Sequence, residues 1–110
     1  MKKYFTFKQT NSGGFLKTSS FDGIGKIVIV VAPNAYEANR RAEDIGLYFD
    51  GVRKGIDCAC CGDRWRPVFE SDGHDVPTYY GDPIDEDYVL HHYSGNFEYI
   101  TFDKDEFYED

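Results

Sequence analysis

Three cysteines lie within four consecutive positions, and a glycine follows them: Cys58, Cys60, Cys61 and Gly62. Thiolates bind zinc strongly, and the spacing Cys-x-x-Cys-Gly is typical of one knuckle of a zinc ribbon, where the glycine lets the backbone turn beneath the metal. A closed tetrahedral site needs two donors beyond one knuckle, and the candidates are Cys60, His74, and His91 or His92. The sequence therefore predicts one structural zinc ion, with the ligands Cys58, Cys60, Cys61 and His74.

Two other interpretations of the cysteines stay open. They can be small buried residues in a glycine-ended turn, with Asp63 and Arg64 forming a local ion pair and Trp65 anchoring the loop. They can also be a redox pair, but such a pair normally opens a helix, and the charged stretch before Pro67 is a poor helix start. An odd number of clustered thiols fits a reducing compartment better than an oxidising one.

Acidic residues are concentrated at the end of the chain. Residues 82–110 hold ten Asp or Glu and one Lys, a net charge of −9, whereas residues 1–81 hold eleven Lys or Arg and ten Asp or Glu. A surface of this charge repels nucleic acids and anionic membranes and attracts basic protein surfaces. We therefore expect a protein partner with a basic surface, bound through carboxylates: Asp85, Glu86, Asp87, Asp103, Asp105 and Glu106.

Two alternative functions use residues next to or within the cysteine stretch. Arg64, Trp65 and Arg66 supply cationic and aromatic groups for a small ligand such as a nucleotide signal. A zinc-dependent enzyme centred on Cys58, Cys61 and His74 needs an open coordination position in a pocket. Because the chain lacks a phosphate-cradling glycine motif, a Gly-x-Ser-x-Gly elbow and a His-Glu-x-x-His motif, we expect a protein that is not an enzyme.

The elements that position these residues follow from local patterns. Residues 3–9 alternate as a half-buried strand does, with Phe5 and Phe7 on one side, and a short second strand is expected near residues 15–18. The run at residues 26–32 is β-branched and apolar throughout, which predicts a central strand covered on both faces. A helix is predicted over residues 35–45, capped by Asn34 and ended by Gly46. Residues 88–93 and 97–102 have the pattern of a hairpin.

Together these elements predict an α+β fold. We expect an antiparallel or mixed sheet of about four to five strands, the helix 35–45 packed on it, and a long loop region over residues 57–87. The 110 residues fit one domain, 1–110, with an acidic C-terminal tail at 103–110. No run approaches the length of a membrane-spanning helix, and the N-terminus lacks the apolar block of a signal peptide, so we expect a cytoplasmic protein.

Several segments resemble small uncharacterised proteins of tailed bacteriophages. The resemblance covers most of the chain and is carried by Tyr4-Phe5-Thr6-Phe7 with Asn11-Ser12-Gly13-Gly14, by Glu37-Ala38-Asn39 with Gly46-Leu47-Tyr48-Phe49-Asp50-Gly51, and by the distinctive Cys58-x-Cys60-Cys61-Gly62-Asp63-Arg64-Trp65. It implies a phage accessory protein made in the host bacterial cytoplasm, and no catalytic or ligand role comes with it. By analogy with small acidic phage proteins, we expect it to bind and modulate a host protein, such as a defence or nucleic-acid-handling factor.

Overall fold

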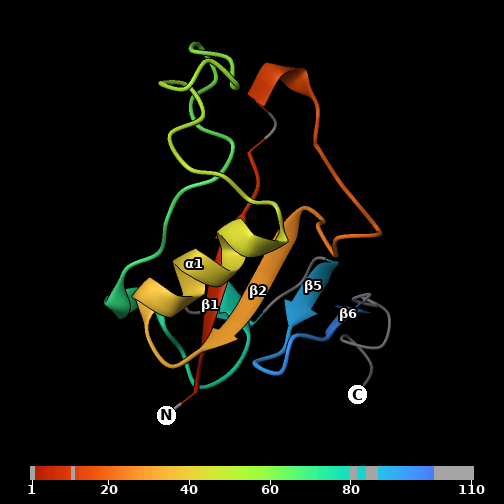
Figure 1. Ribbon diagram of the computed structural model, residues 1–110, viewed down its shortest axis with the longest axis vertical. Helices are drawn as coiled ribbons and strands as arrows, with labels where there is room; N and C mark the ends of the chain where they lie inside the picture. Colours follow the sequence, from red (N-terminus) through yellow and green to blue (C-terminus); the bar gives the residue numbers. More distant parts are fainter. Residues whose placement is uncertain (1, 11, 80–81, 84–86, 101–110) are drawn as a thin grey trace.

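The computed structural model describes residues 2–10, 12–79, 82–83 and 87–100, and these form a mixed sheet with one helix (Figure 1). In chain order the elements are β1 (Lys3–Lys8), a 3-10 turn (Ser12–Gly14), β2 (Ile27–Ala32), α1 (Ala35–Ile45), a second 3-10 turn (Glu70–Asp72), β3 (Thr78–Tyr79), β4 (Asp82–Pro83), β5 (Tyr88–His91) and β6 (Phe97–Ile100). The predicted α+β arrangement, a sheet of about four to five strands with one main helix, is confirmed, and the main sheet has four strands. Part of the predicted loop region is ordered, because β3 and β4 pair within it.

The main sheet has the strand order β1-β2-β5-β6. β1 and β2 are antiparallel, β2 and β5 are parallel, and β5 and β6 are antiparallel, so the sheet is mixed. All six residues of β2 are buried, which confirms the central strand predicted from its apolar run. The predicted hairpin is also present as β5 and β6, although the described residues end at Ile100.

The helix α1 lies across β1 and β2 in Figure 1 and is capped as the sequence predicts. Asn34 Oδ1 accepts a hydrogen bond from the backbone N–H of Glu37 at 2.8 Å. Gly46 adopts the left-handed conformation that ends the helix, with φ of 119°. The small side chains on the buried stripe, Ala35, Ala38 and Ala42, let the helix approach the sheet closely.

Apolar side chains cover both faces of β2. One face packs against the helix and the segments that follow it, and the buried residues of this cluster are Phe5, Phe7, Val28, Val30, Ala32, Ala35, Ala38, Ala42, Leu47, Trp65 and Val68. The opposite face holds a smaller cluster of Ile27, Ile29, Val31 and Leu90. The larger cluster includes Trp65 from the cysteine stretch, so the core holds one end of that stretch in place. Within the described residues, α1 falls short of the length and apolarity needed to cross a membrane.

The strand predicted near residues 15–18 is wrong. The side chain of Gln9 takes the place of a partner strand there: its Oε1 accepts from Lys17 N at 2.5 Å, and its Nε2 donates to Lys17 O at 2.8 Å. Gln9 is 2% exposed, so these bonds are shielded from water. The buried amide of Gln9 therefore provides hydrogen-bond partners for both the N–H and the C=O of Lys17, which a neighbouring strand would otherwise supply.

Candidate functional site

The three cysteines lie together on one surface loop. Their Sγ atoms are all within 4.8 Å of one another, and those of Cys58 and Cys60 are 2.8 Å apart. All three are free thiols, with Cys60 and Cys61 exposed and Cys58 half-buried. Three convergent sulfur donors of this kind can hold a metal ion.

The backbone of the loop turns as the Cys-x-x-Cys-Gly spacing predicts. The carbonyl oxygen of Cys58 accepts hydrogen bonds from the N–H groups of Cys61, at 3.2 Å, and Gly62, at 3.1 Å. Gly62 has a φ of 87°, in the left-handed region that a residue with a Cβ enters only at a cost. The chain therefore wraps around the Cys58 carbonyl, and this brings the sulfur atoms to one side.

The thiols differ in how readily they lose a proton. A hydrogen bond from the side chain of Cys60, helped by backbone N–H groups and by Cys61, lowers the pKa of the Cys58 thiol to about 7. The same contact raises the pKa of Cys60, because a second thiolate beside the first is unfavourable. At neutral pH the Cys58 thiol is therefore partly ionised, next to thiols that a metal ion can deprotonate.

A buried ion pair fixes the loop where the cysteines begin and end. Arg64 Nε lies 3.6 Å from Asp57 Oδ1, and the two side chains are 2% and 0% exposed. Asp57 also accepts hydrogen bonds from Tyr48 OH, at 2.7 Å, and from the backbone N–H of Arg64, at 2.8 Å. Each carboxylate oxygen of Asp57 therefore accepts at least one hydrogen bond, which lowers the cost of burying the charge.

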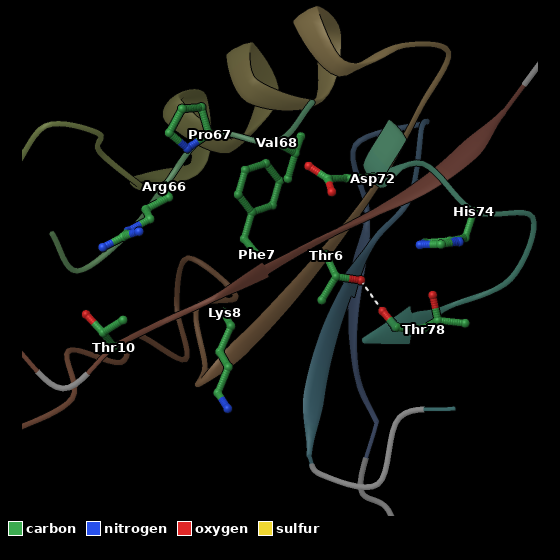
Figure 2. A pocket seen from close by; sticks show the side chains of 10 residues that line it. All are labelled: Thr6, Phe7, Lys8, Thr10, Arg66, Pro67, Val68, Asp72, His74 and Thr78. Atoms are coloured by element: carbon green, nitrogen blue, oxygen red, sulfur yellow. Dashed lines mark hydrogen bonds between the residues drawn. The ribbon is translucent and has the colours of Figure 1, made fainter. Parts of the chain in front are cut away.

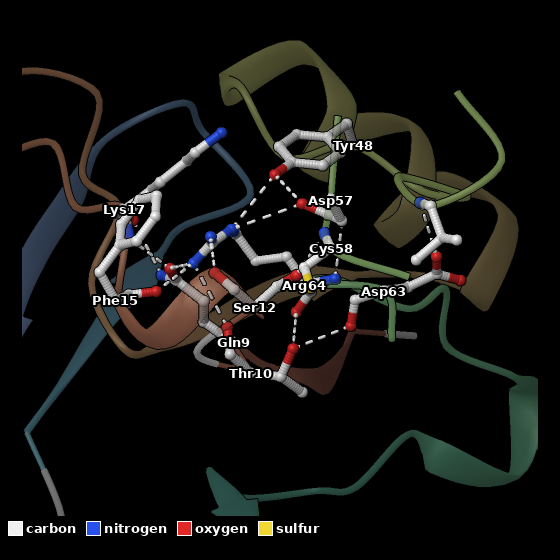
Figure 3. Close-up of polar contacts among 11 residues, drawn as sticks. Gln9, Thr10, Ser12, Phe15, Lys17, Tyr48, Asp57, Cys58, Asp63 and Arg64 are labelled. Atoms are coloured by element: carbon white, nitrogen blue, oxygen red, sulfur yellow. Dashed lines mark hydrogen bonds and ion pairs between the residues drawn. The ribbon is translucent and has the colours of Figure 1, made fainter. Parts of the chain in front are cut away.

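The guanidinium of Arg64 also joins the loop to the N-terminal third of the chain (Figure 3). It donates to oxygens on segments far away in sequence: Gln9 Oε1 at 2.9 Å, Ser12 O at 2.6 Å and Phe15 O at 2.7 Å. The backbone N–H of Cys58 donates to Ser12 Oγ at 3.0 Å. One arginine therefore joins the cysteine loop to residues 9–15, using several of the five N–H groups that only arginine offers.

Asp63 forms a second attachment next to Arg64. Its Oδ1 accepts the backbone N–H of Val52 at 3.0 Å, and its carbonyl oxygen accepts Thr10 Oγ1 at 2.8 Å. One interpretation of the sequence expected an ion pair between Arg64 and its neighbour Asp63. This is wrong, because Arg64 pairs with Asp57 instead. Trp65 anchors the loop as that interpretation predicts, because it is 2% exposed within the main core.

The histidines do not join the cysteines. His74 pairs with Tyr4 through two backbone hydrogen bonds of 2.8 and 3.0 Å at the edge of β1, and the thiol group includes no histidine or carboxylate of the described residues. Buried His91 contacts Gly23 O through Nε2 at 2.7 Å, and burial lowers its pKa. His92 is on the other face, 3.1 Å from Glu98. The structure therefore brings together three of the four predicted metal ligands and leaves His74 elsewhere.

The three residues predicted for a small ligand are split between interior and surface. Arg64 and Trp65 are each 2% exposed, so a ligand does not reach them without opening the core. Arg66 is exposed and lines a cavity of about 270 Å³ beside β1, together with Lys8, His74, Thr78 and others (Figure 2). Of the predicted set, only Arg66 is placed to contact a ligand.

The residues predicted for partner binding are mostly outside the described residues. Asp87 is described and exposed, just before β5. The other five, Asp85, Glu86, Asp103, Asp105 and Glu106, fall in ranges that the structure does not describe. β6, which pairs with β5, presents exposed aromatic rings, with Phe97 37% and Tyr99 51% exposed.

The sequence analysis did not identify the residues whose side chains hold the two ends of the cysteine loop in place. Asp57, Gln9 and Ser12 contact Arg64 or Cys58 through their side chains, and each looks like an ordinary surface residue by type. One signal was available: Asp57 and Arg64 carry opposite charges on either side of the cysteines. Opposite charges at the two ends of a short loop are consistent with closure by an ion pair.

Comparison with known families gives one match. A family model described as "Domain of unknown function (DUF7296)" matches residues 2–107, which include the whole sheet, the helix and the cysteine loop. No curated protein and no solved structure matches the chain.

Proposed function

The chain belongs to the family described as domain of unknown function DUF7296, and on that premise we propose that it is a non-enzymatic protein that binds and modulates another protein. The partner in this proposal has a basic surface. Since the family description transfers no activity, the surface chemistry of the described residues has to support the proposal.

The aromatic surface at the outer strand of the sheet is the observation that supports the proposal best. β6 is last in the strand order, and its ring-bearing residues Phe97 and Tyr99 are 37% and 51% exposed. The two rings meet edge to face with centroids 5.9 Å apart, and Tyr93, from the preceding turn, is 54% exposed. Rigid aromatic side chains on a surface are the kind of contact that protein interfaces favour.

Negative charge accompanies these rings. Asp87 is exposed before β5. On β6 the side chain of Glu98 is 52% exposed, next to His92 and on the face of the strand opposite to the two rings. Residues 103–110, which follow in the sequence, add five Asp or Glu and one Lys. An aromatic surface with acidic neighbours is complementary to a basic protein and unfavourable to nucleic acid or an anionic membrane.

We further propose that the partner is a bacterial host factor, and that the chain acts in the host cytoplasm as an accessory protein of a bacteriophage. This part rests on the resemblance carried by the stretch from Cys58 to Trp65. A host protein that handles nucleic acid would offer a basic surface, and an acidic protein can occupy it in place of phosphates.

Neutralising the acidic residues is expected to slow binding. The six-residue variant Asp85→Asn, Glu86→Gln, Asp87→Asn, Asp103→Asn, Asp105→Asn and Glu106→Gln should lower the association rate constant for the captured partner about tenfold or more at low salt, because electrostatic steering is lost. The partner is first captured from bacterial lysate with tagged wild-type chain, and rates are then measured by surface plasmon resonance over a range of salt concentrations.

A control variant removes three acidic charges from the other part of the chain. Glu43, Asp44 and Asp75 are exposed, and their amide variants should leave the rate and its salt dependence nearly unchanged. Equal association rates for the wild-type chain and the six-residue variant would rule out the electrostatic part of the proposal.

A second candidate function is supported by the cavity beside β1. Arg66, Lys8 and His74 line it beside one carboxylate, Asp72, whose Oδ2 accepts the backbone N–H of Phe69. The buried Thr78 Oγ1 in its wall has no hydrogen-bond partner among the described residues. These groups suit a small anionic ligand such as a nucleotide signal. Native mass spectrometry of chain incubated with bacterial extract should show a bound small molecule, and Arg66→Ala should remove most of it. Binding that Arg66→Ala leaves intact would exclude this cavity.

For the thiol cluster we propose zinc as the ion bound in cells. Zinc is redox-inert, accepts sulfur ligands readily and prefers the tetrahedral geometry to which a Cys-x-x-Cys-Gly turn is suited. The three sulfur atoms within 4.8 Å of one another support this choice.

A further inference from the structure

The cysteine loop is held by protein contacts on both sides of the thiols. Before them, Asp57 is bound by Tyr48 and Arg64, and the N–H of Cys58 is bound by Ser12. After them, Asp63 is bound by Val52 and Thr10. None of these contacts involves a sulfur atom, so none depends on a metal ion.

This arrangement differs from that of a structural zinc site. Such sites are closed by four protein ligands and supply folding energy, so the chain around them is often unfolded without metal. Here the loop is closed by a buried ion pair, with side chains 2% and 0% exposed, and Trp65 docks in the main core. We therefore expect metal binding to add little to the folding of this loop.

The donor set is also open. Among the described residues only the three sulfur atoms converge, and Cys60 and Cys61 are exposed. Zinc keeps a fourth position for water or an added ligand when a protein supplies three donors. The exposed side of the cluster is where that position would lie, and it gives metal ions and competing chelators direct access.

We propose that Cys58, Cys60 and Cys61 form an open three-sulfur site that takes up and releases one soft metal ion without refolding of the chain. The inference rests on zinc as the ion proposed above and departs from the structural role that the sequence predicts for it. Its fourth ligand is water or a donor from outside the chain, and His74 takes no part.

Binding at this site releases protons. A metal ion binds thiolates, so it displaces the protons of whichever of the three thiols are still protonated. Affinity therefore increases as the pH rises, whereas the folded state persists with or without metal.

The test uses the full chain, reduced and freed of metal with a chelator, and cadmium ion as the probe. Titration is followed by the ultraviolet charge-transfer band of cadmium–thiolate bonds. We expect the band to saturate at one cadmium per chain, and each of Cys58→Ser, Cys60→Ser and Cys61→Ser to weaken it by about a third, because each removes one of three donors. The control His74→Gln should leave both the band and the stoichiometry unchanged.

A second measurement tests whether the site is structural. Circular dichroism and Trp65 fluorescence of the zinc-loaded chain are recorded before and after chelation, and both should be unchanged. Loss of the folded signals on chelation would overturn the inference while leaving zinc itself as the proposed ion. A band that His74→Gln weakens as much as the serine variants do would also overturn it. Absence of any cadmium band would instead refute metal binding at the cysteines. Capture of the partner protein by the metal-free chain tests the proposed protein-binding function separately.

Discussion

Replacing Arg64 with alanine is expected to lower the free energy of unfolding by about 3–5 kcal/mol, which is the usual effect of removing one partner of a buried ion pair. The variant leaves the carboxylate of Asp57, 0% exposed, without its counter-charge. It also leaves the carbonyl oxygens of Ser12 and Phe15 without the donor they have in the folded chain. Small domains are stable by only about 5–15 kcal/mol, so urea denaturation should show a large shift in midpoint.

Two further variants separate the guanidinium group from its charge. Arg64→Lys keeps the charge, but its three N–H donors sit on one atom and do not span the separate oxygens that the planar guanidinium reaches. It should therefore recover only part of the loss. Arg53, exposed and ahead of the cysteines on the same loop, is the matched control, and Arg53→Ala should change the free energy of unfolding by less than about 0.5 kcal/mol. A loss below about 1 kcal/mol for Arg64→Ala would show that the ion pair does not hold the loop.

The second large effect is expected from Trp65→Ala, which should destabilise the fold by about 3–5 kcal/mol. Trp65 is 2% exposed and lies in the cluster that covers one face of β2, so its removal leaves a cavity that its neighbours cannot fill completely. Because Trp65 is the only tryptophan in the chain, unfolding of the variant has to be followed by circular dichroism.

Phe69 provides the comparison for this prediction. It is 69% exposed, so Phe69→Ala should cost much less than Trp65→Ala even though both remove an aromatic ring. Trp65→Phe keeps most of the apolar volume and should fall between the two. Equal destabilisation by Trp65→Ala and Phe69→Ala would contradict the position of Trp65 in the core.

The sheet and helix were predictable where one local pattern dominates. The apolar, β-branched run of residues 26–32 leaves no polar face, so a buried central strand was the only good solution, and β2 is one. Asn34 and Gly46 mark the two ends of α1 because each satisfies backbone groups that the helix leaves without partners. These signals need no knowledge of the rest of the fold.

Pairings between distant segments were not predictable. The parallel register of β2 with β5, such as Val28 with Val89, brings together strands that lie far apart in the sequence, and no local pattern specifies it. The false strand near residues 15–18 has the same origin, since the bonds that replace it come from the side chain of Gln9. When a side chain, and not a neighbouring strand, makes the backbone hydrogen bonds, the pattern of apolar residues does not reveal it.

The candidate site was only partly predictable for a related reason. Cysteine spacing and Gly62 were sufficient to predict the turn and the convergence of the sulfur atoms. Burial of Arg64 was not predictable, because arginine is normally exposed and its partner Asp57 is not its neighbour in the chain. His74 could be assigned to the metal site only on residue type, and its backbone pairing with Tyr4 places it at the edge of β1.

Amide hydrogen exchange of the metal-free, reduced chain tests most directly whether protein contacts alone hold the cysteine loop. The N–H of Cys58, bound to Ser12 Oγ, and the N–H of Arg64, bound to Asp57 Oδ2, report on the two ends of the loop. We predict that both are protected without metal and that added zinc changes their protection little. Exchange of both groups at the rate of an unfolded chain, with protection appearing only after zinc is added, would contradict this.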